Sequence, residues 1–146
     1  MQTISQNLNE TYDFARNFLA QLAGVKRAAA TVVALYGDLG SGKTTFTQFL
    51  AKELGVNNYV TSPTFVIEKR YPLKTGQFKN LIHIDCYRLN DPKGMEVLGW
   101  GEMAADPSNL IVVEWPERIE AILPNDSVRI EFEFVSENER KIEVKG

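Results

Sequence analysis

The sequence lacks the features that would place the protein in an oxidising compartment or in a membrane. Its 146 residues include one cysteine, Cys86, so a disulfide within the chain is excluded. No apolar run approaches the ~20 residues that a membrane-spanning helix requires, and residues 1–6 lack the basic start and apolar core of a secretory signal. We therefore expect a cytoplasmic protein with no membrane contact.

A surplus of positive charge is also absent. The formal net charge is −3 and the isoelectric point is near 5.2, whereas domains that hold nucleic acid by their own field usually carry a basic face. Lysine and arginine occur in scattered pairs, at 26–27, 69–70 and 140–141, as is typical of solvated surface charge. If RNA is involved, we expect another subunit to hold most of it.

The chain does contain enough apolar residues for one globular domain. Hydrophobic residues make up 44% of the sequence, and a chain of this length buries roughly two-thirds of its unfolded surface on folding. No internal repeat, low-complexity segment or linker interrupts it. We therefore interpret residues 1–146 as a single domain.

The most informative segment is the glycine-rich string GDLGSGKT at residues 37–44. It follows the apolar run 31–36 and precedes a helical pattern, and this context distinguishes a phosphate-binding P-loop from a chance glycine turn. In such a loop, inward-facing backbone N–H groups surround the phosphates, Lys43 reaches the β- and γ-phosphates, and the Thr44 hydroxyl binds Mg²⁺. The positive end of the following helix adds to the same pocket. The sequence therefore predicts a nucleoside triphosphate site.

Helical periodicity marks two longer segments. Apolar or small residues recur on one face of residues 8–22, and Asn7 with Glu10 forms a capping-box pattern at the start. The second helix is predicted over residues 43–54, directly after the P-loop and before a glycine. A short helix is expected near residues 92–98. The two longer helices are expected to cover a sheet.

Strand patterns occupy much of the remaining chain. Residues 65–67 and 81–84 are separated by a polar loop and favour an antiparallel pair. The uninterrupted apolar run 110–113 indicates a central parallel strand. The alternation of apolar and polar residues over 128–134 indicates a strand with one solvent-exposed face, and residues 141–144 are expected to form the last strand of a hairpin. We predict an α/β fold: a three-layer P-loop NTPase domain with a mixed, largely parallel sheet, a C-terminal antiparallel hairpin, and nucleotide at the carboxyl ends of the strands.

Hydrolysis or transfer of phosphate also requires a metal-positioning carboxylate and a group that orients the attacking oxygen. Glu114 and Asp85 each close a buried apolar run, so both should emerge at strand ends, where a Walker B acid lies. For each of them the alternative is a solvated acid, or an ion pair with Arg88 or Arg118.

Other side chains fit either a structural or a functional role. Thr64 lies in the hydroxyl-rich stretch 61–65, which is either a switch that senses the γ-phosphate or only a turn that enters a strand. Trp115 is either a core aromatic or a wall of the nucleotide pocket. His83 is interpreted as a packed strand residue rather than a base or ligand, and Cys86 as an inert small residue.

Four segments together resemble the TsaE (YjeE) family, the bacterial ATPases of tRNA threonylcarbamoyladenosine synthesis. They are GDLGSGKTT at 37–45, SPTF at 62–65, HIDCYRL at 83–89 and VEWPER at 113–118. The P-loop alone is generic, whereas the other three in this order and spacing are specific. The resemblance spans nearly the whole chain.

The resemblance implies a small ATPase that binds ATP or ADP with Mg²⁺ and works with the partner pair TsaB and TsaD. The partner transfers a threonylcarbamoyl group to adenosine beside the tRNA anticodon, and ATP hydrolysis drives or resets that cycle. tRNA contact would then be indirect, through the partners, and the chain alone is expected to be a monomer. Two other functions stay open: a nucleotide-gated binding module without essential hydrolysis, and a small-metabolite kinase, although no arginine cluster for an acceptor is evident.

Roles carried over by position follow from the same resemblance. Asp85 would align or activate water, Lys43 would contact the phosphates, and Thr64 would lie in the first switch. Thr44 and Glu114 would hold Mg²⁺. The implied nucleotide-binding residues are Leu8, Gly37, Asp38, Leu39, Gly40, Ser41, Gly42, Lys43, Thr44, Thr45, Trp115, Glu139 and Arg140.

Overall fold

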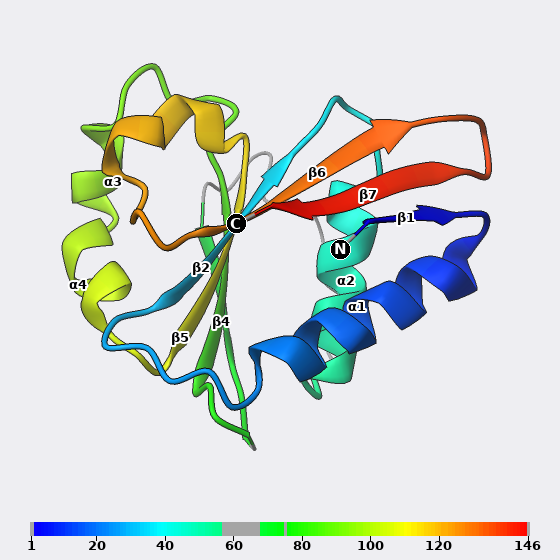
Figure 1. The fold of residues 1–146 in the computed structure, drawn as a ribbon. Helices are drawn as coiled ribbons and strands as arrows, with labels where there is room; N and C mark the ends of the chain where they lie inside the picture. Colours follow the sequence, from blue (N-terminus) through cyan, green and yellow to red (C-terminus); the bar gives the residue numbers. More distant parts are fainter. Residues whose placement is uncertain (1, 57–67, 75, 146) are drawn as a thin grey trace.

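The computed structural model describes residues 2–56, 68–74 and 76–145, whose strands form a seven-stranded sheet (Figure 1). The strands are β1 (Gln2–Ser5), β2 (Thr31–Tyr36), β3 (Glu68–Pro72), β4 (Asn80–Asp85), β5 (Asn109–Glu114), β6 (Val128–Phe134) and β7 (Arg140–Lys145). The helices are α1 (Leu8–Leu22), α2 (Lys43–Glu53), α3 (Gly94–Val97), α4 (Trp100–Ala105) and the 3₁₀ helix η1 (Pro116–Ile122).

The strand order is β1-β7-β6-β2-β5-β4-β3. The four central strands β6, β2, β5 and β4 run parallel, whereas β1, β7 and β3 join antiparallel to their neighbours. The predicted mixed sheet with a C-terminal antiparallel hairpin is therefore confirmed. Because parallel strands end at one edge of the sheet, the register places Asp85 of β4 directly beside Glu114 of β5.

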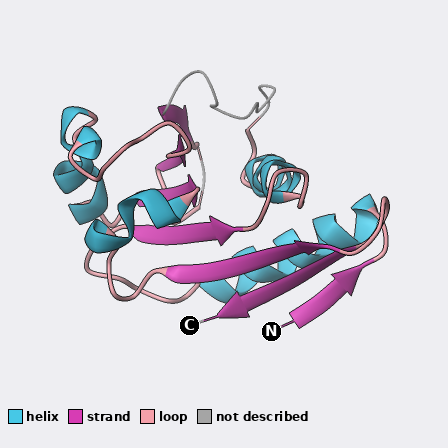
Figure 2. Cartoon of the chain, turned by 90° about the horizontal axis from the view of Figure 1, so that it is seen from above, coloured by secondary structure: helices cyan, strands magenta, loops and turns pink. Residues whose placement is uncertain are grey.

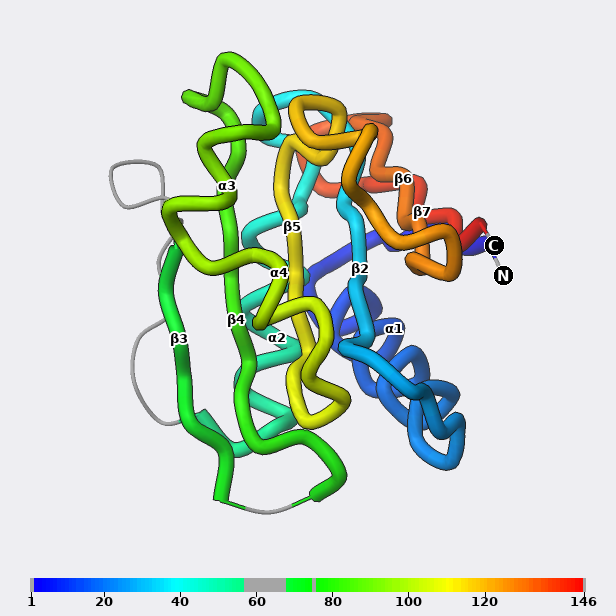
Figure 3. Tube along the Cα trace, turned by 90° about the vertical axis from the view of Figure 1, so that its left-hand side faces the viewer, coloured from blue at the N-terminus to red at the C-terminus, as the bar shows by residue number. Residues whose placement is uncertain are grey.

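Helices cover both faces of this sheet and give it three layers (Figures 2 and 3). In Figure 3, α3 and α4 lie in front of the sheet and α2 lies behind it. The face behind is filled by α1, α2 and the inward side chains of the strands, among them Phe14, Phe18, Phe46, Leu50, Val33, Leu35, Val112 and Ile130. The opposite face packs α3, α4 and η1 through Met95, Trp100, Met103, Ile119, Val32, Ile82 and Ile111. Both faces are apolar because the central strands are buried on both sides.

The start of α1 follows the predicted capping pattern. Asn7 has an extended backbone and its Oδ1 accepts from the Glu10 N–H at 3.0 Å. Glu10 reaches back to the Gln6 N–H at 3.2 Å, one residue before the usual capping-box partner. Leu8 was expected on the apolar face, but it is 66% exposed, and Phe14 takes a core position instead.

Most of the remaining element predictions are confirmed with shifted bounds or additions. The strand expected at 65–67 lies outside the described residues. β4 does have an antiparallel neighbour, but this is β3 at residues 68–72, which belong to the segment that was expected to be the loop between the two strands. The short helix expected near 92–98 is α3, and α4 follows it directly. β1 was not predicted. Within the described ranges no helix is long and apolar enough to cross a membrane.

Candidate nucleotide-binding site

The loop between β2 and α2 has the tight backbone that the P-loop string predicts. Gly37 has φ +145°, and a Cβ atom there would lie 2.6 Å from the Phe132 carbonyl oxygen and 2.7 Å from Ser41 Oγ. Gly42, the residue directly before α2, has a left-handed backbone with φ +105°. Any side chain at Gly37 would therefore push the loop away from β6, which explains why the turn needs glycine.

Lys43 is the first residue of α2 and lies inside this loop. Its side chain is buried, and Nζ donates to the Gly37 carbonyl oxygen at 2.5 Å. Nζ also lies 4.1 Å from the centre of the Trp115 ring, which gives a cation–π contact. Burial lowers the pKa of the ammonium, while Glu114 and other nearby carboxylates oppose this shift. The ammonium is thus held at the loop by a carbonyl and an aromatic face, two partners that a phosphate can replace.

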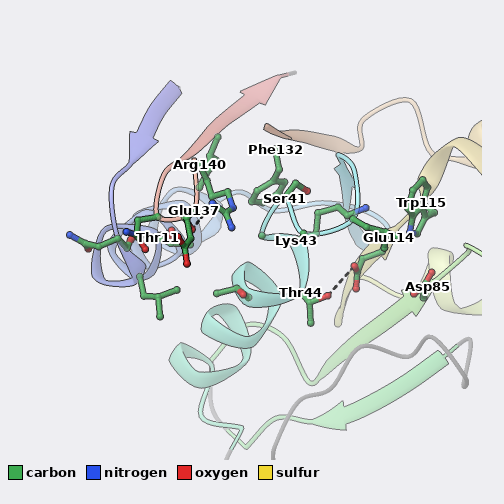
Figure 4. A pocket seen from close by; sticks show the side chains of 18 of the residues that line it. Thr11, Ser41, Lys43, Thr44, Asp85, Glu114, Trp115, Phe132, Glu137 and Arg140 are labelled. Atoms are coloured by element: carbon green, nitrogen blue, oxygen red, sulfur yellow. Dashed lines mark hydrogen bonds between the residues drawn. The ribbon is translucent and has the colours of Figure 1, made fainter. Parts of the chain in front are cut away.

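Thr44 and Glu114 face each other across the mouth of the loop (Figure 4). The Thr44 hydroxyl donates to Glu114 Oε1 at 3.3 Å. Glu114 ends β5 and is almost completely buried. In the part of the chain that the structure describes, no three His, Cys, Asp or Glu side chains form a metal-holding cluster. One hydroxyl and one carboxylate nevertheless suit Mg²⁺, which prefers hard oxygen ligands and takes the rest of its shell from water and phosphate.

Asp85 lies next to this pair, at the end of β4. Its Oδ1 accepts from the Tyr87 N–H at 2.8 Å, so the carboxylate is fixed by the backbone that follows the strand. Burial raises the pKa of Asp85, and the hydrogen bond from Tyr87 partly offsets that shift. The alternative of a solvated strand-end acid is wrong for both Asp85 and Glu114, because both are buried in the described structure.

These groups line one cavity of about 790 Å³. Its wall contains most of the expected nucleotide-binding residues: Leu8, Leu39, Gly40, Ser41, Gly42, Lys43, Thr44, Thr45, Trp115 and Arg140. Asp85 and Glu114 are also part of the wall. Gly37, Asp38 and Glu139 do not line it, and Thr64 lies outside the described residues. The cavity is large enough for a small-molecule ligand.

Other residues of the wall were not predicted from sequence. They are Asn7, Asn9, Thr11, Tyr87, Phe132, Glu137, Asn138 and Ile142. The capping pattern identified the first turn of α1, but only as a structural feature and not as part of a binding site. The turn between β6 and β7 has no motif that could have identified it. In that turn Glu137 and Asn138 line the cavity, while the backbone of Glu139 closes the turn through hydrogen bonds with residues 135 and 136.

Arg140 fixes this same turn. Its Nη1 donates to the carbonyl oxygens of Ser136, Glu137 and Glu139 at 2.6, 3.2 and 2.9 Å. Its stem lies beside the P-loop, because a Cβ at Gly42 would be 3.7 Å from Arg140 Cγ. Arg140 therefore links the last hairpin to the phosphate loop.

Trp115 has the only left-handed backbone among the described non-glycine residues, with φ +56°. Its ring lies against Lys43 and is 5.1 Å from the Tyr87 ring, centre to centre. The two roles considered for it are both present, because the indole packs partly against the core and also lines the cavity. A bulky residue in this conformation stores strain of order 1–3 kcal/mol, which is typical of functional sites.

His83 was interpreted as a packed strand residue, and it is fully buried in β4. Packing is not its whole role, since Nε2 lies 2.5 Å from Glu114 Oε2. Cys86 is buried as expected, and burial raises the pKa of its thiol to about 12, which makes it unreactive.

The strand–loop–helix unit, with acids at the ends of β5 and β4, gives the domain the architecture of the P-loop NTPase fold. Comparison with known proteins is more specific. The family model described as "Threonylcarbamoyl adenosine biosynthesis protein TsaE" matches residues 5–142. The chain belongs to this family, and the resemblance drawn from its motifs is confirmed.

Similar proteins cover nearly the same length. The tRNA threonylcarbamoyladenosine biosynthesis protein TsaE of Aquifex aeolicus is 37% identical over 145 residues, which cover 98% of this chain and 94% of that protein. The protein of the same name from Bacillus subtilis is 37% identical over 124 residues, 85% of this chain and 75% of its own. The crystal structure of Bacillus subtilis YdiB has a TM-score of 0.74 at 32% identity and covers 97% of this chain and 82% of that one.

Proposed function

We propose that this protein is the Mg²⁺-dependent ATPase of tRNA threonylcarbamoyladenosine synthesis, and that it acts in the cytoplasm with a TsaB–TsaD type complex. That complex transfers the threonylcarbamoyl group to adenosine beside the anticodon and makes the main contact with tRNA. The observation that carries the proposal is that a phosphate loop, the Thr44–Glu114 pair and Asp85 share one cavity, in a chain of the TsaE family.

Binding of the triphosphate begins with the loop. Its backbone amides and the start of α2 attract the phosphates, and Lys43 exchanges the Gly37 carbonyl for phosphate oxygens. This exchange is favourable because a buried ammonium gains an anionic partner in place of a neutral one. ADP binds to the same loop with fewer contacts.

The chemistry depends on the two acids. Thr44 and Glu114 would hold Mg²⁺, and the ion would supply positive charge to neutralise the phosphates. Asp85 orients the attacking water and accepts its proton. Its raised pKa favours this role, because a more basic carboxylate is a better proton acceptor. Lys43 offsets the charge that develops on the transferred group.

The test is reconstitution with purified TsaB, TsaD and tRNA, with modified nucleoside counted per molecule of this protein. We expect many turnovers with MgATP and no more than one with a non-hydrolysable analogue. Lys43→Ala should lose activity, whereas Lys52→Ala, an exposed lysine at the other end of α2, should keep it. Multiple turnovers with the analogue would identify a binding module instead, and a phosphorylated small acceptor would identify a kinase.

A further inference from the structure

His83 is the only histidine of the chain, and its side chain is fully buried. It lies on β4 between Ile82 and Ile84, where an apolar side chain would fill the space without a polar atom to satisfy. One ring nitrogen, Nε2, lies 2.5 Å from Glu114 Oε2. The other, Nδ1, is buried and has no hydrogen-bond partner among the residues that the structure describes.

These two environments specify the tautomer. A carboxylate oxygen only accepts, so Nε2 must carry the hydrogen and donate it to Glu114. A second hydrogen on Nδ1 would be a buried donor without an acceptor, which costs roughly 1–3 kcal/mol. The geometry therefore favours a ring with hydrogen on Nε2 and a bare Nδ1.

The contact also determines how the Glu114 carboxylate is turned. One oxygen, Oε2, is engaged by His83, and the other, Oε1, accepts from the Thr44 hydroxyl at 3.3 Å. Adjacent strands β4 and β5 hold the two side chains at a fixed register, two residues apart along the pair. Without a donor at position 83, the carboxylate could rotate, and its inner oxygen would be left buried and unpaired.

We propose that His83 is a positioning residue that holds Glu114 with Oε1 directed toward Thr44, so that both Mg²⁺ ligands are arranged before the ion arrives. This inference rests on the proposed function, because it assumes that the pair binds the metal of a magnesium nucleotide. Residues that orient a metal ligand commonly contribute 10–100-fold to metal affinity. In this protein, His83 would be the residue that orients Glu114.

Two substitutions separate positioning from packing. His83→Met is apolar and of similar volume but cannot donate, whereas His83→Gln retains an N–H donor at nearly the position of Nε2. The readout is the dissociation constant of ADP, measured by calorimetry with Mg²⁺ and with EDTA, so the test does not depend on catalysis. We expect metal-free affinities within about twofold of wild type for both variants, since His83 does not line the cavity.

Positioning and packing predict opposite rankings of the two variants in the Mg²⁺-dependent gain in affinity. If His83 positions Glu114, His83→Met loses about tenfold of the Mg²⁺-dependent gain in affinity and His83→Gln retains it. If His83 only fills space, His83→Met retains the gain and His83→Gln is the worse variant. The second order, or equal gains in both variants, would overturn the inference while leaving ATP binding by the wild-type protein intact. Absence of nucleotide binding by the wild type would instead overturn the proposed function.

A measurement on the wild-type protein decides the question if the variants do not fold. The single imidazole gives one unambiguous set of signals in a long-range ¹H–¹⁵N NMR spectrum. We expect the tautomer with hydrogen on Nε2, before and after MgADP is added. Hydrogen on Nδ1 alone would contradict the proposal, because Nε2 would then have no hydrogen to donate to Glu114.

Discussion

Three charged side chains of the site, Lys43, Asp85 and Glu114, are almost completely buried. Burial of a charge destabilises a fold unless partners compensate it. Here the Lys43 ammonium and the two carboxylates face the same cavity, so the ammonium and each carboxylate reduce one another's cost, whereas Glu114 adds to the cost of charging Asp85. In the proposed function these groups would have to meet a metal and a phosphate, and a loss of stability is common at such functional sites.

Asp85→Asn tests at one residue whether a buried charge of the site lowers stability while supporting activity. Burial raises the pKa of Asp85 above its ordinary value of 3.8, so the unfolded chain releases the proton first as the pH rises. The carboxylate therefore reduces stability at neutral pH, and this cost disappears below pH 3.8, where both states are protonated. Asparagine removes the charge and keeps an oxygen for the Tyr87 N–H. We expect a larger free energy of unfolding at pH 7, a gain that shrinks toward pH 4, and hydrolysis lower by about 100-fold.

Urea denaturation from pH 7 to pH 4 measures the stability, and phosphate release by the reconstituted system measures the hydrolysis. Asp91 provides the control, because its Oδ1 also accepts from a backbone N–H two residues later but its side chain is exposed. Asp91→Asn should show neither the pH-dependent gain nor the loss of activity. A gain for Asp85→Asn that does not change with pH would contradict the buried-charge explanation.

At the scale of elements, the first turn of α1 combines a cap with part of the cavity wall. Asn7 caps the helix, and Asn7, Leu8, Asn9 and Thr11 all line the cavity. The position of this wall therefore depends on where the helix begins. α1 packs on α2, which carries the P-loop at its start, so the two helices place opposite sides of the same site.

Asn7→Ala should destabilise the protein by about 1 kcal/mol, because the Glu10 N–H loses its acceptor. ADP affinity should fall as well, since the first turn frays where it forms the wall. Chemical denaturation and calorimetry measure the two effects. Asn7→Asp retains a capping oxygen and should restore stability, whereas Asn9→Ala changes the wall without removing the cap. Loss of stability in Asn9→Ala equal to that in Asn7→Ala would show that the cap is not the cause.

Elements with local signals could be predicted from the sequence. The apolar strand, glycine loop and helix of residues 31–54 are consecutive, and Asn7 and Glu10 lie only three residues apart at the start of α1. β1 gave no such signal, because its four residues are mostly polar or exposed and pair only with β7 at the other end of the chain. Strand pairing over that distance is decided by tertiary structure rather than by local preference.

At the scale of the whole molecule, the cavity is built from both ends of the chain. α1 and the turn between β6 and β7 meet the P-loop only in the folded domain, which explains why Glu139 was predicted and Glu137 and Asn138 were missed. The contact of His83 with Glu114 likewise depends on the β4–β5 register. By contrast, Asp85 and Glu114 could be found from sequence because each directly follows a buried apolar run.

A ligand that contacts all these segments binds the folded chain and not the unfolded one. It therefore stabilises the entire domain, by about 2.7 kcal/mol when its concentration is 100 times the dissociation constant. For a domain of this size, that corresponds to a rise in the melting temperature of roughly 5–11 °C. The rise should be larger with Mg²⁺ than with EDTA, because Thr44 and Glu114, as the proposed metal ligands, would contribute only through the metal.

Thermal melting with increasing MgADP measures this effect, and the rise should follow the logarithm of free ligand once the site is saturated. Lys43→Ala should abolish most of it, since the phosphates lose their ammonium. Lys52→Ala on the exposed side of the same helix should show the same ligand-induced rise as wild type. Arg140→Ala should reduce the rise but not remove it, because it releases the hairpin turn while the P-loop remains. A full rise in Lys43→Ala would place the bound nucleotide outside this loop, and the assignment of the cavity would then be wrong.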